Sequence, residues 1–491
     1  MKLPATFERP TTADTGSMMR VADYLDPRPQ EPLAGWIPRR LGEFVWSKQR
    51  EVCESVEKHR FTAVPSCHGA GKSYIASRIA AAWLDIHPPG EAFVVTSAPT
   101  DKQVKAILWR EMGRAHRKGN LQGRINLDAE WFIGPELVAY GRKPQDLTDP
   151  NEAMQAFQGI HARYVLVVLD EAGGVPAWLW TAAESLVTNE HSRILAIGNP
   201  DDPSSHFEEV CRPGSGWNVL PISAFDMPWA TGEEVPEALN DLLTGQIWVE
   251  ERAKRWGVES PFYISKVLGQ FPEIGDDTLI TPAIVRMAQE YESVDSLVLG
   301  TMGADIARLG SDRTVVYHNR GGMVRKVYEK HKQNTTPTTG ALFRLSKKFW
   351  NRVCINIDSI GLGAGVYDRL VELGCYMYPF GAGDRPYEPE RFLNKRSEGW
   401  WKLREAFEEG IVDLDPTDED LAGQLCNIKF WYTSSGKVQI ESKDELKKRG
   451  LPSPDHADAC MMSFYRGPEM FEPEDGELME DLTGDLLDMP M

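Results

Sequence analysis

Residues 66–73 read Ser-Cys-His-Gly-Ala-Gly-Lys-Ser, and they constrain the fold of this chain more than any other segment. A short apolar run, 61–65, precedes them, and a long helical pattern, 74–84, follows them. Strand, glycine loop and helix in that order are the context of a P-loop, whose small residues let main-chain N–H groups surround a phosphate. The segment departs from the pattern G-x-x-x-x-G-K-[ST] at its first position, which is Ser66. It predicts a nucleotide site, with an ordinary glycine turn before a helix as the alternative.

The individual residues of this segment have separate expected roles. Ser66, Gly69 and Gly71 would form the loop, and the following helix N-terminus adds a partial positive charge. Lys72 would reach the β- and γ-phosphates of ATP, and the Ser73 hydroxyl would ligate Mg²⁺. These five residues are therefore the first nucleotide-binding candidates.

A second motif follows about a hundred residues downstream, where the apolar run 164–169 ends in Asp170 and Glu171. Continuous apolar runs are typical of parallel strands buried on both faces, and ligands bind at the carboxyl ends of such strands. Asp170 would hold Mg²⁺, and Glu171 would polarise the attacking water. An acidic helix start is the alternative, but the two motifs in this order predict an ATPase.

Two smaller signals accompany these motifs. The strand pattern 192–197 ends in Gly-Asn-Pro, which places Asn199 where it would sense the γ-phosphate; plain turn chemistry is the alternative. Trp46 and Gln49 precede the P-loop and would stack on and hydrogen-bond an adenine, unless the tryptophan only packs.

The composition is that of a globular protein. The chain has 491 residues, of which 42% are hydrophobic and 26% charged, so two or three domains with substantial cores are expected. No apolar run approaches the ~20 residues of a membrane span, and the N-terminus lacks the apolar stretch of a signal peptide. The seven cysteines form no C-x-x-C pair, which favours a reducing cytoplasm over a zinc site or a disulfide framework.

The formal net charge of −19 disfavours nucleic-acid binding at first sight. Part of the excess is local, because 469–488 holds many acids and no Lys or Arg, as a solvated tail or a docking segment would. Basic residues gather at 39–40, 102–118 and 443–449. DNA binding would therefore use localised basic surfaces, although each cluster taken singly is more often a solvated face.

The chain divides by composition and periodicity into five parts. Residues 1–40 predict a partly disordered arm, and 41–220 an α/β domain with a parallel sheet covered by helices. Residues 221–290 predict a lid or linker subdomain, and 291–466 a second α/β domain. Residues 467–491 are the acidic tail.

The second α/β part carries widely separated acids at element ends. Asp305 lies on its first strand and Asp358 at the end of a later strand, while Asp455 and Asp458 lie one turn apart in the last helix. Such acids are how a two-metal nuclease gathers oxygen ligands for Mg²⁺ or Mn²⁺. Unrelated acids at strand ends and helix caps are the alternative.

Taken together, the motifs resemble the large terminase subunit, the DNA-packaging motor of tailed bacteriophages. The resemblance runs from about Trp46 to about Tyr465. The matching pieces are 46–49, 66–73, 97–100, 157–161, 169–171, 198–200, 269–272, 303–305, 357–358 with Gly361, Gly363 and Gly365, and 453–459.

This resemblance implies an N-terminal RecA-like ATPase domain of the additional-strand kind with a small lid, and a C-terminal RNase H-like nuclease. It implies an ATP-driven motor that translocates double-stranded DNA into a procapsid and cuts concatemers with a metal-dependent endonuclease. Asp305, Asp358 and Asp458 match the metal ligands, Asp455 matches an auxiliary acid, and 198–200 matches the segment that couples hydrolysis to movement.

The implied partners are double-stranded DNA, the portal protein, the small terminase subunit and further copies of the chain. These copies would form a ring on the portal, with a monomer as the alternative for the free protein, in the cytoplasm of the infected bacterial host and without membrane contact. Some terminases carry an arginine in the P-loop where this chain has His68, so Arg110, Arg114 and Arg142 are the remaining candidates for an arginine finger. The rivals are a cellular helicase-nuclease of another lineage and a structural docking protein that only binds nucleotide.

Overall fold

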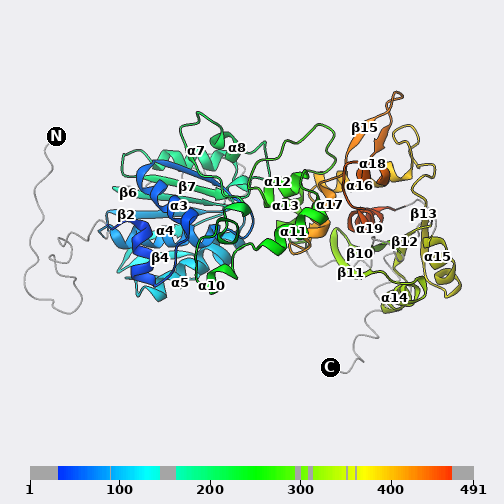
Figure 1. The fold of residues 1–491 in the computed structure, drawn as a ribbon, viewed down its shortest axis with the longest axis horizontal. Coiled ribbons are helices and arrows are strands. Elements are labelled where there is room, and N and C mark those ends of the chain that lie inside the picture. Colours follow the sequence, from blue (N-terminus) through cyan, green and yellow to red (C-terminus); the bar gives the residue numbers. More distant parts are fainter. Residues whose placement is uncertain are drawn as a thin grey trace, which may run out of the picture. The chain divides into compact units, whose positions relative to one another are not determined.

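The computed structural model describes residues 31–88, 90–143, 162–293, 300–307, 313–349, 352–359 and 362–466. They form two compact units, drawn in Figure 1. The first unit contains the described residues up to Pro200 and Ser204–Gly245; the second contains Asp201–Pro203 and the described residues from Gln246 onward. The motif at 157–161, the acidic tail and most of the N-terminal arm lie outside the described residues.

The first unit is built on a sheet with the strand order β3-β4-β5-β2-β6-β7-β1-β8. From β5 to β8 all neighbours run parallel, and β3 and β4 extend one edge antiparallel. The strand that ends at the P-loop, β1, and the strand that ends in the two acids, β6, are separated by β7. An inserted strand at this place defines the additional-strand type of P-loop fold, so that prediction is confirmed.

The strands of this sheet are short and mostly buried. Their bounds are β1 Phe61–Pro65, β2 Ala92–Ser97, β3 Arg124–Ile125, β4 Glu130–Ile133, β5 Glu136–Gly141, β6 Tyr164–Asp170, β7 Arg193–Gly198 and β8 Asn218–Val219.

Helices pack around the sheet, and α4, which follows the P-loop, packs against β2, β6 and β7. The helical bounds are α2 Leu33–Trp36, η1 Ile37–Leu41, α3 Ser47–Lys58, α4 Lys72–Ile86, η2 Gln103–Trp109, α5 Arg110–Lys118, η3 Ala172–Gly174, α7 Ala177–Leu186, α8 His206–Cys211, η4 Ala224–Asp226, α9 Pro228–Thr231 and α10 Glu237–Asn240.

The second unit contains a sheet with the order β13-β12-β9-β10-β11-β14. The first three strands along the chain form an antiparallel meander, β9-β10-β11, and β12 and β13 then add parallel to β9 on its other side. A meander extended by parallel strands in this order is the RNase H-like arrangement, which confirms the predicted fold. β10 pairs antiparallel with β9, and Val315 lies opposite Asp305.

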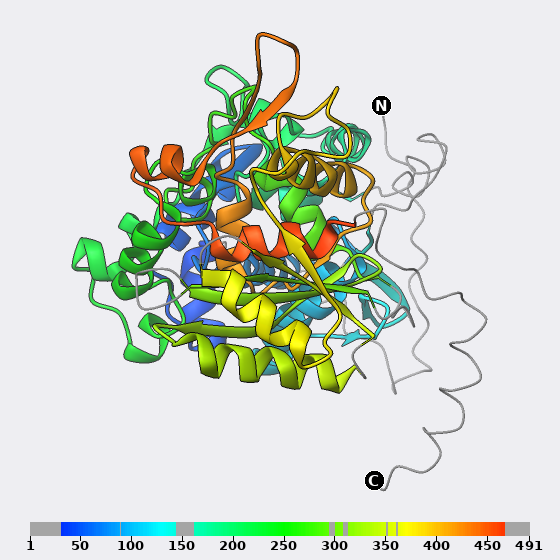
Figure 2. The same cartoon turned by 90° about the vertical axis from the view of Figure 1, so that its right-hand side faces the viewer.

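Figure 2 shows α19, in red-orange, on one face of this sheet and α14 and α15, in yellow tones, on the other. The bounds are α11 Gln246–Trp256, α12 Pro261–Lys266, α13 Pro282–Glu290, β9 Thr301–Asp305, β10 Arg313–Arg320, β11 Met323–His331, α14 Thr335–Lys348, β12 Cys354–Asp358, α15 Leu362–Glu372, β13 Met377–Phe380, α16 Lys395–Glu408, β14 Asp413–Leu414, α17 Glu419–Leu425, β15 Phe430–Tyr432, β16 Val438–Ile440, α18 Lys443–Lys448 and α19 Asp455–Phe464.

The last helix, α19, lies unusually close to β9. A side-chain Cβ at Gly303 would come within 2.1 Å of the Ala459 carbonyl oxygen and 2.4 Å of the Ser463 nitrogen. The Asn356 amide on β12 donates to the carbonyls of Met462 and Tyr465, at 2.6 and 2.7 Å. These contacts clamp α19 to the sheet and so place its first turn beside the strand ends.

Among the described residues, no helix is both long and apolar enough to cross a membrane.

Candidate active sites

The P-loop has the main-chain geometry that its glycines predict. Gly69 and Gly71 both have left-handed backbones, with φ of 67° and 75°, which glycine adopts without steric cost. The loop turns directly into α4, whose first residue is Lys72. Lys72 is buried, and its Nζ donates to the Cys67 carbonyl at 3.1 Å. The Lys72 ammonium therefore donates a hydrogen bond to its own loop, in the place of the phosphate oxygen that would accept this hydrogen bond in a nucleotide complex.

A later segment of the same unit holds the loop from outside. The Thr244 hydroxyl donates to the His68 carbonyl at 2.6 Å, and the Thr244 nitrogen donates to the Gly69 carbonyl at 3.3 Å. A Cβ at Gly69 would lie 2.3 Å from the Thr244 hydroxyl. Thr244 was not predicted as a site residue, because it lies far from the motif in sequence.

The two predicted magnesium ligands of the first unit meet in the structure. The Ser73 hydroxyl lies close enough to the Asp170 carboxylate to favour its charged form, although Ser73 is in the first turn of α4 and Asp170 ends β6. Burial, followed by repulsion from the Glu171 carboxylate, raises the pKa of Asp170 to about 7 against the opposing effects of Ser73 and Lys72. A divalent cation would relieve this cost, so the pair fits Mg²⁺ by its oxygen chemistry.

Glu171 has a strained backbone. Its φ of 47° and ψ of 49° lie in the left-handed region, which is uncommon for residues other than glycine. The turn lies close against the neighbouring strand β7: a Cβ at Gly198 would come within 2.7 Å of the Ala172 backbone nitrogen and 3.1 Å of the Glu171 carbonyl carbon. Strain of this kind gathers at functional sites and here orients the half-buried Glu171 at the sheet edge.

Asn199 also lies at this edge. Its side-chain amide donates to the Ser66 carbonyl at 2.6 Å, and the Ser66 nitrogen donates to the Gly198 carbonyl at 2.9 Å. The residue expected to sense the γ-phosphate is thus tied to the first residue of the P-loop.

Trp46 and Gln49 lie at the start of α3, next to the P-loop. A Cβ at Gly71 would meet the Gln49 amide nitrogen at 2.8 Å, so this side chain covers the loop. Both polar ends of the Gln49 amide, and the Trp46 indole nitrogen, are buried without a hydrogen-bond partner among the described residues. Unsatisfied buried donors and acceptors are costly, and a base edge would satisfy them. This observation fits an adenine at Gln49, whereas the fully buried Trp46 ring offers no exposed face for stacking.

The candidate arginine fingers have different surroundings. Arg142 pairs with Glu130 at 2.7 Å, and Arg114 pairs with Glu111. Arg110 is exposed on α5. None of these three is ion-paired with a P-loop residue within the described part of the first unit.

The acids of the second unit gather at one edge of its sheet. Asp305 ends β9 and Asp358 ends β12, and the two strands are parallel neighbours, with Ala304 opposite Ile357. Asp455 and Asp458 lie in the first turn of α19, which packs on β9. The Asp455 carboxylate accepts a hydrogen bond from the backbone N–H of Arg313, with a donor–acceptor distance of 2.6 Å. The structure thus brings all four predicted residues to one place.

Three cationic or donor groups hold two of these acids. Lys443 Nζ lies 3.1 Å from Asp305 Oδ2 and 3.1 Å from Asp458 Oδ2. Arg396 Nη1 donates to Asp458 Oδ1 at 2.6 Å, and the Trp400 indole donates to the same oxygen at 3.1 Å. Lys443 therefore bridges two carboxylates as a cation.

The electrostatics of the cluster follow from this arrangement. Burial raises the pKa of Asp305, with added repulsion from Asp458 and Asp358 and against the attraction of Lys443. Burial also raises the pKa of Asp455, to about 7, with repulsion from Asp305. Burial would raise the pKa of Asp458 too, but Arg396 and Lys443 outweigh it and lower that pKa.

The side chains of this cluster fit hard divalent cations, because their ligand atoms would be carboxylate oxygens. These carboxylates repel one another, and the ammonium of Lys443 already lies beside Asp305. In the conformation described, no group of three or more His, Cys, Asp or Glu side chains among the described residues is arranged to hold a metal ion. The ammonium of Lys443 occupies the position between the two carboxylates.

The sequence interpretation missed the residues that orient these acids. Lys443 belongs to the basic cluster 443–449, and Arg396 and Trp400 belong to no motif in the sequence. Gln424 on α17 was also missed. Its side-chain oxygen accepts hydrogen bonds from the backbone N–H groups of His456 and Ala457, at 2.8 and 3.1 Å. The N-cap of α19 is Pro454, and Gln424 on α17 accepts from two of the first backbone N–H groups of the helix.

No known family profile matches this sequence. A curated relative, a probable terminase large subunit of Enterobacteria phage P7, is 24% identical to it, and the alignment covers 92% of this chain and 96% of the relative. The chain is similar to large terminase subunits along nearly its whole length. The resemblance predicted from the motifs is thereby confirmed.

Solved structures of such proteins are also similar. The large terminase of a thermophilic bacteriophage, in complex with ADP, is 12% identical, with a TM-score of 0.40, covering 87% of this chain and 99% of that one. The nuclease domain of the large terminase subunit of bacterial virus Sf6 is 18% identical, with a TM-score of 0.34, covering 39% of this chain and 99% of that one.

Proposed function

We propose that this chain is a large terminase subunit: an ATP-driven motor that moves double-stranded DNA into a procapsid and cuts concatemeric DNA. The observation that carries the proposal is the union of two sheets in one chain. In the additional-strand P-loop sheet, strand β6 ends at Asp170 and is followed by Glu171. In the RNase H-like sheet, clustered acids lie at the strand ends, beginning with Asp305 on β9. The curated relative from phage P7, similar over 92% of the chain, supports it.

In the proposed ATPase domain, 41–220, the P-loop amides and Lys72 bind the phosphates. Ser73 and Asp170 hold Mg²⁺, which when bound supplies charge neutralisation for the triphosphate. Glu171 takes the proton of the attacking water, and its fixed backbone keeps the carboxylate at the sheet edge. Gln49 binds the adenine edge, and Asn199 reports phosphate occupancy through its bond to Ser66.

In the proposed nuclease domain, 291–466, the residues Asp305, Asp358 and Asp458 hold Mg²⁺ or Mn²⁺, with Asp455 assisting. When bound there, two such ions would supply the positive charge for activating a water and for stabilising the leaving oxygen of the cut strand. Lys443 neutralises two of the acids while the ions are away, and Arg396 and Trp400 orient Asp458. Residues 221–290 form the lid or linker.

The proposed partners follow from this assignment. They are double-stranded DNA, the portal protein, the small terminase subunit and further copies of the chain in a ring on the portal. The place of action is the cytoplasm of the infected bacterial host. The helicase-nuclease rival requires a second RecA-like sheet, and the described residues contain one P-loop sheet and one RNase H-like sheet.

Paired variants test the two activities separately. Glu171→Ala should lower ATP turnover by roughly 10²–10⁴-fold while leaving nucleotide binding largely intact, because it removes a positioned base. Lys72→Ala should weaken nucleotide use. Asp305→Ala and Asp358→Ala should eliminate plasmid cleavage and keep ATP turnover within a few-fold of wild type.

Phosphate release and plasmid nicking are measured on each purified variant. Wild-type turnover by Glu171→Ala would refute the ATPase assignment. Cleavage by both aspartate variants, or equal cleavage in excess EDTA, would refute the nuclease assignment.

A further inference from the structure

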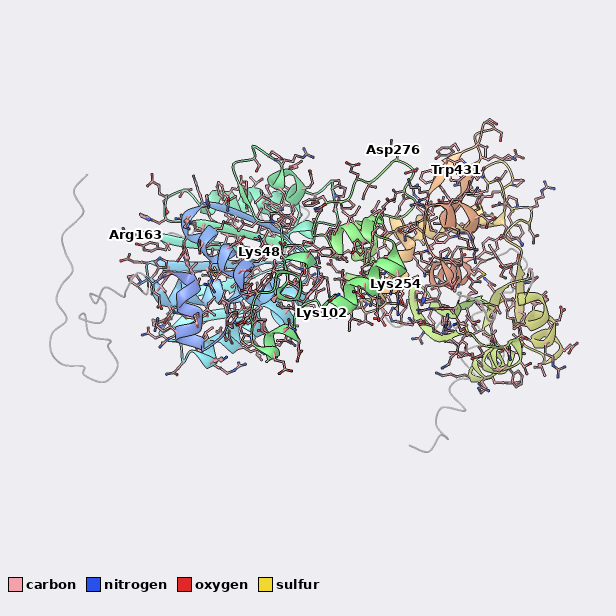
Figure 3. The ribbon with its side chains drawn as sticks, viewed as in Figure 1. Lys48, Lys102, Arg163, Lys254, Asp276 and Trp431 are labelled. Carbon is pink, nitrogen blue, oxygen red and sulfur yellow. The ribbon has the colours of Figure 1, made fainter. Side chains whose placement is uncertain are left out.

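The stretch from Asp101 to Lys118 forms a basic face on an acidic protein. It follows β2 and consists of η2, a π-helix, and α5. Its exposed cations are Lys102 (labelled in Figure 3), Lys105, Arg110, Arg114, Arg117 and Lys118. Against these six positive charges the stretch has two acids, Asp101 and Glu111, which leaves a net charge of +4 in a chain of net charge −19.

Part of this charge is not neutralised by the protein. Arg110 and Arg117 have no ion pair among the described residues, and both are exposed. Arg110, Arg114 and Arg117 follow the spacing i, i+4, i+7, so they lie on one side of α5. Over that span the helix rises by roughly 10 Å, at about 1.5 Å per residue. This side therefore presents a row of guanidinium groups to solvent.

Hydrogen bonds and an ion pair connect the elements that carry this row to the elements of the proposed nucleotide site. The Trp109 indole, at the end of η2, donates to the Thr96 hydroxyl on β2 at 2.8 Å, in the buried interior. Arg78 on α4, the helix that begins at Lys72, pairs with Glu111 at 2.9 Å and also donates to its carbonyl. β2 pairs with β6, with Ser97 opposite Leu169, the residue before Asp170. Movement of the P-loop helix or of this strand end would displace the arginine row. π-Helical turns such as those of η2 are rare and are frequently found at functional sites.

We propose that the exposed side of η2 and α5 is the surface by which the ATPase unit contacts the phosphate backbone of double-stranded DNA. The inference rests on the proposed function, because it takes the motor's DNA as the ligand. DNA presents one negative charge per about 1.7 Å of duplex, an array that a row of guanidinium groups matches without reading sequence. Arginine also bonds phosphate through two N–H groups at once.

An acidic protein surface is the competing partner. Protein interfaces usually have apolar or aromatic side chains at their centre, and the only large apolar side chain exposed between residues 101 and 118 is Ile107. The composition of this face therefore favours a polyanion that is bound by charge alone.

The test uses the full-length protein in EDTA, so that no cutting occurs. Binding of a short fluorescein-labelled DNA duplex is followed by anisotropy over a series of NaCl concentrations. The test variant is Arg110→Ala with Arg117→Ala. The matched control is Arg163→Ala with Arg212→Ala, two arginines of the same unit whose side chains are 58% and 61% exposed and which remove the same charge. Thermal melting confirms that both variants are folded.

The test variant should bind duplex on the order of tenfold or more weakly than the control at moderate salt. The slope of log affinity against log salt should fall by roughly 1.8, because each lost phosphate contact removes about 0.9. Equal affinity and slope in the two double variants would overturn the proposal, as would a wild-type protein that binds no duplex at low salt. A test variant that keeps its DNA affinity but loses binding to poly-glutamate would assign the face to an acidic protein instead. Absence of ATP turnover in the wild-type protein would refute the proposed function and leave this result standing.

Discussion

Replacing Gly303 by alanine should separate the two activities by moving one helix. The added Cβ would lie 2.1 Å from the Ala459 carbonyl oxygen, whereas ordinary contacts begin near 3.4 Å, so α19 must shift by about 1.3 Å. The obstructing atoms belong to the backbone of a helix and cannot rotate away. Overpacking of this kind costs about 3 kcal/mol, at the upper end of its usual range. For a unit of this size the Tm would fall by roughly 6–12 °C.

The same shift displaces Asp458 from Asp305. A misplacement of about 1 Å can lower a rate on the order of 10²-fold, so plasmid nicking should fall by that factor. ATP turnover should stay near wild type, because Gly303 belongs to the second unit. The matched control is Gly340→Ala on α14, where the new Cβ meets only the flexible end of Arg344, at 3.6 Å, and where stability should rise by about 0.5–1 kcal/mol. Nicking by Gly303→Ala at the rate of Gly340→Ala would refute the packing argument.

Two further variants test the groups that hold the acids. Lys443→Ala leaves Asp305 and Asp458 without their shared cation, so the metal-free variant should melt at a lower temperature than the wild type. Added Mn²⁺ should then raise the Tm of the variant more than it raises the Tm of the wild type. An equal Mn²⁺-induced rise in Tm would contradict this role of Lys443. Gln424→Ala removes the acceptor for two backbone N–H groups of α19, which should lower the free energy of unfolding by about 1 kcal/mol and raise the Mn²⁺ concentration needed for half-maximal nicking. Gln424→Glu keeps an acceptor oxygen and should behave like the wild type. An equal loss of stability and nicking in both variants would indicate a purely steric effect.

The parts of the sites that lie within a local pattern were predictable from the sequence. The P-loop is a strand, a loop and a helix in one continuous segment, and the acids of β6, β9 and β12 each end a recognisable apolar run. Because parallel strands end at a common edge, the meeting of Asp305 with Asp358 followed from topology alone. The additional-strand type of this sheet was expected from the resemblance, and the structure shows it as β7 between β1 and β6; the full strand order was not predicted.

The groups that orient these residues were not predictable, because they come from distant elements. Thr244 reaches the P-loop across more than 170 residues, and Lys443 reaches Asp305 across 138. No periodicity or motif signals such contacts. The cap of α19 illustrates the limit, since Ser453 and Pro454 form a plausible local start, yet the first N–H groups are satisfied by Gln424 of another helix. The close contact of the Glu171–Ala172 peptide with Gly198 on β7 likewise joins distant elements.

The contact between that backbone and β7 restricts variation at two positions. The last residue of β7, Gly198, has no room for a side chain because the Glu171–Ala172 peptide lies against it. A substitution at Gly198 would thus act as an ATPase mutation at a site that supplies no side chain to the chemistry. The Glu171–Ala172 peptide can approach β7 this closely only while the strand ends in glycine, so among homologues position 198 should change only where this peptide moves as well. A mutational screen scored on ATP turnover should find that substitutions at Gly198 lower turnover, as do substitutions at Lys72 and Glu171. At Gly198 the cause would be steric.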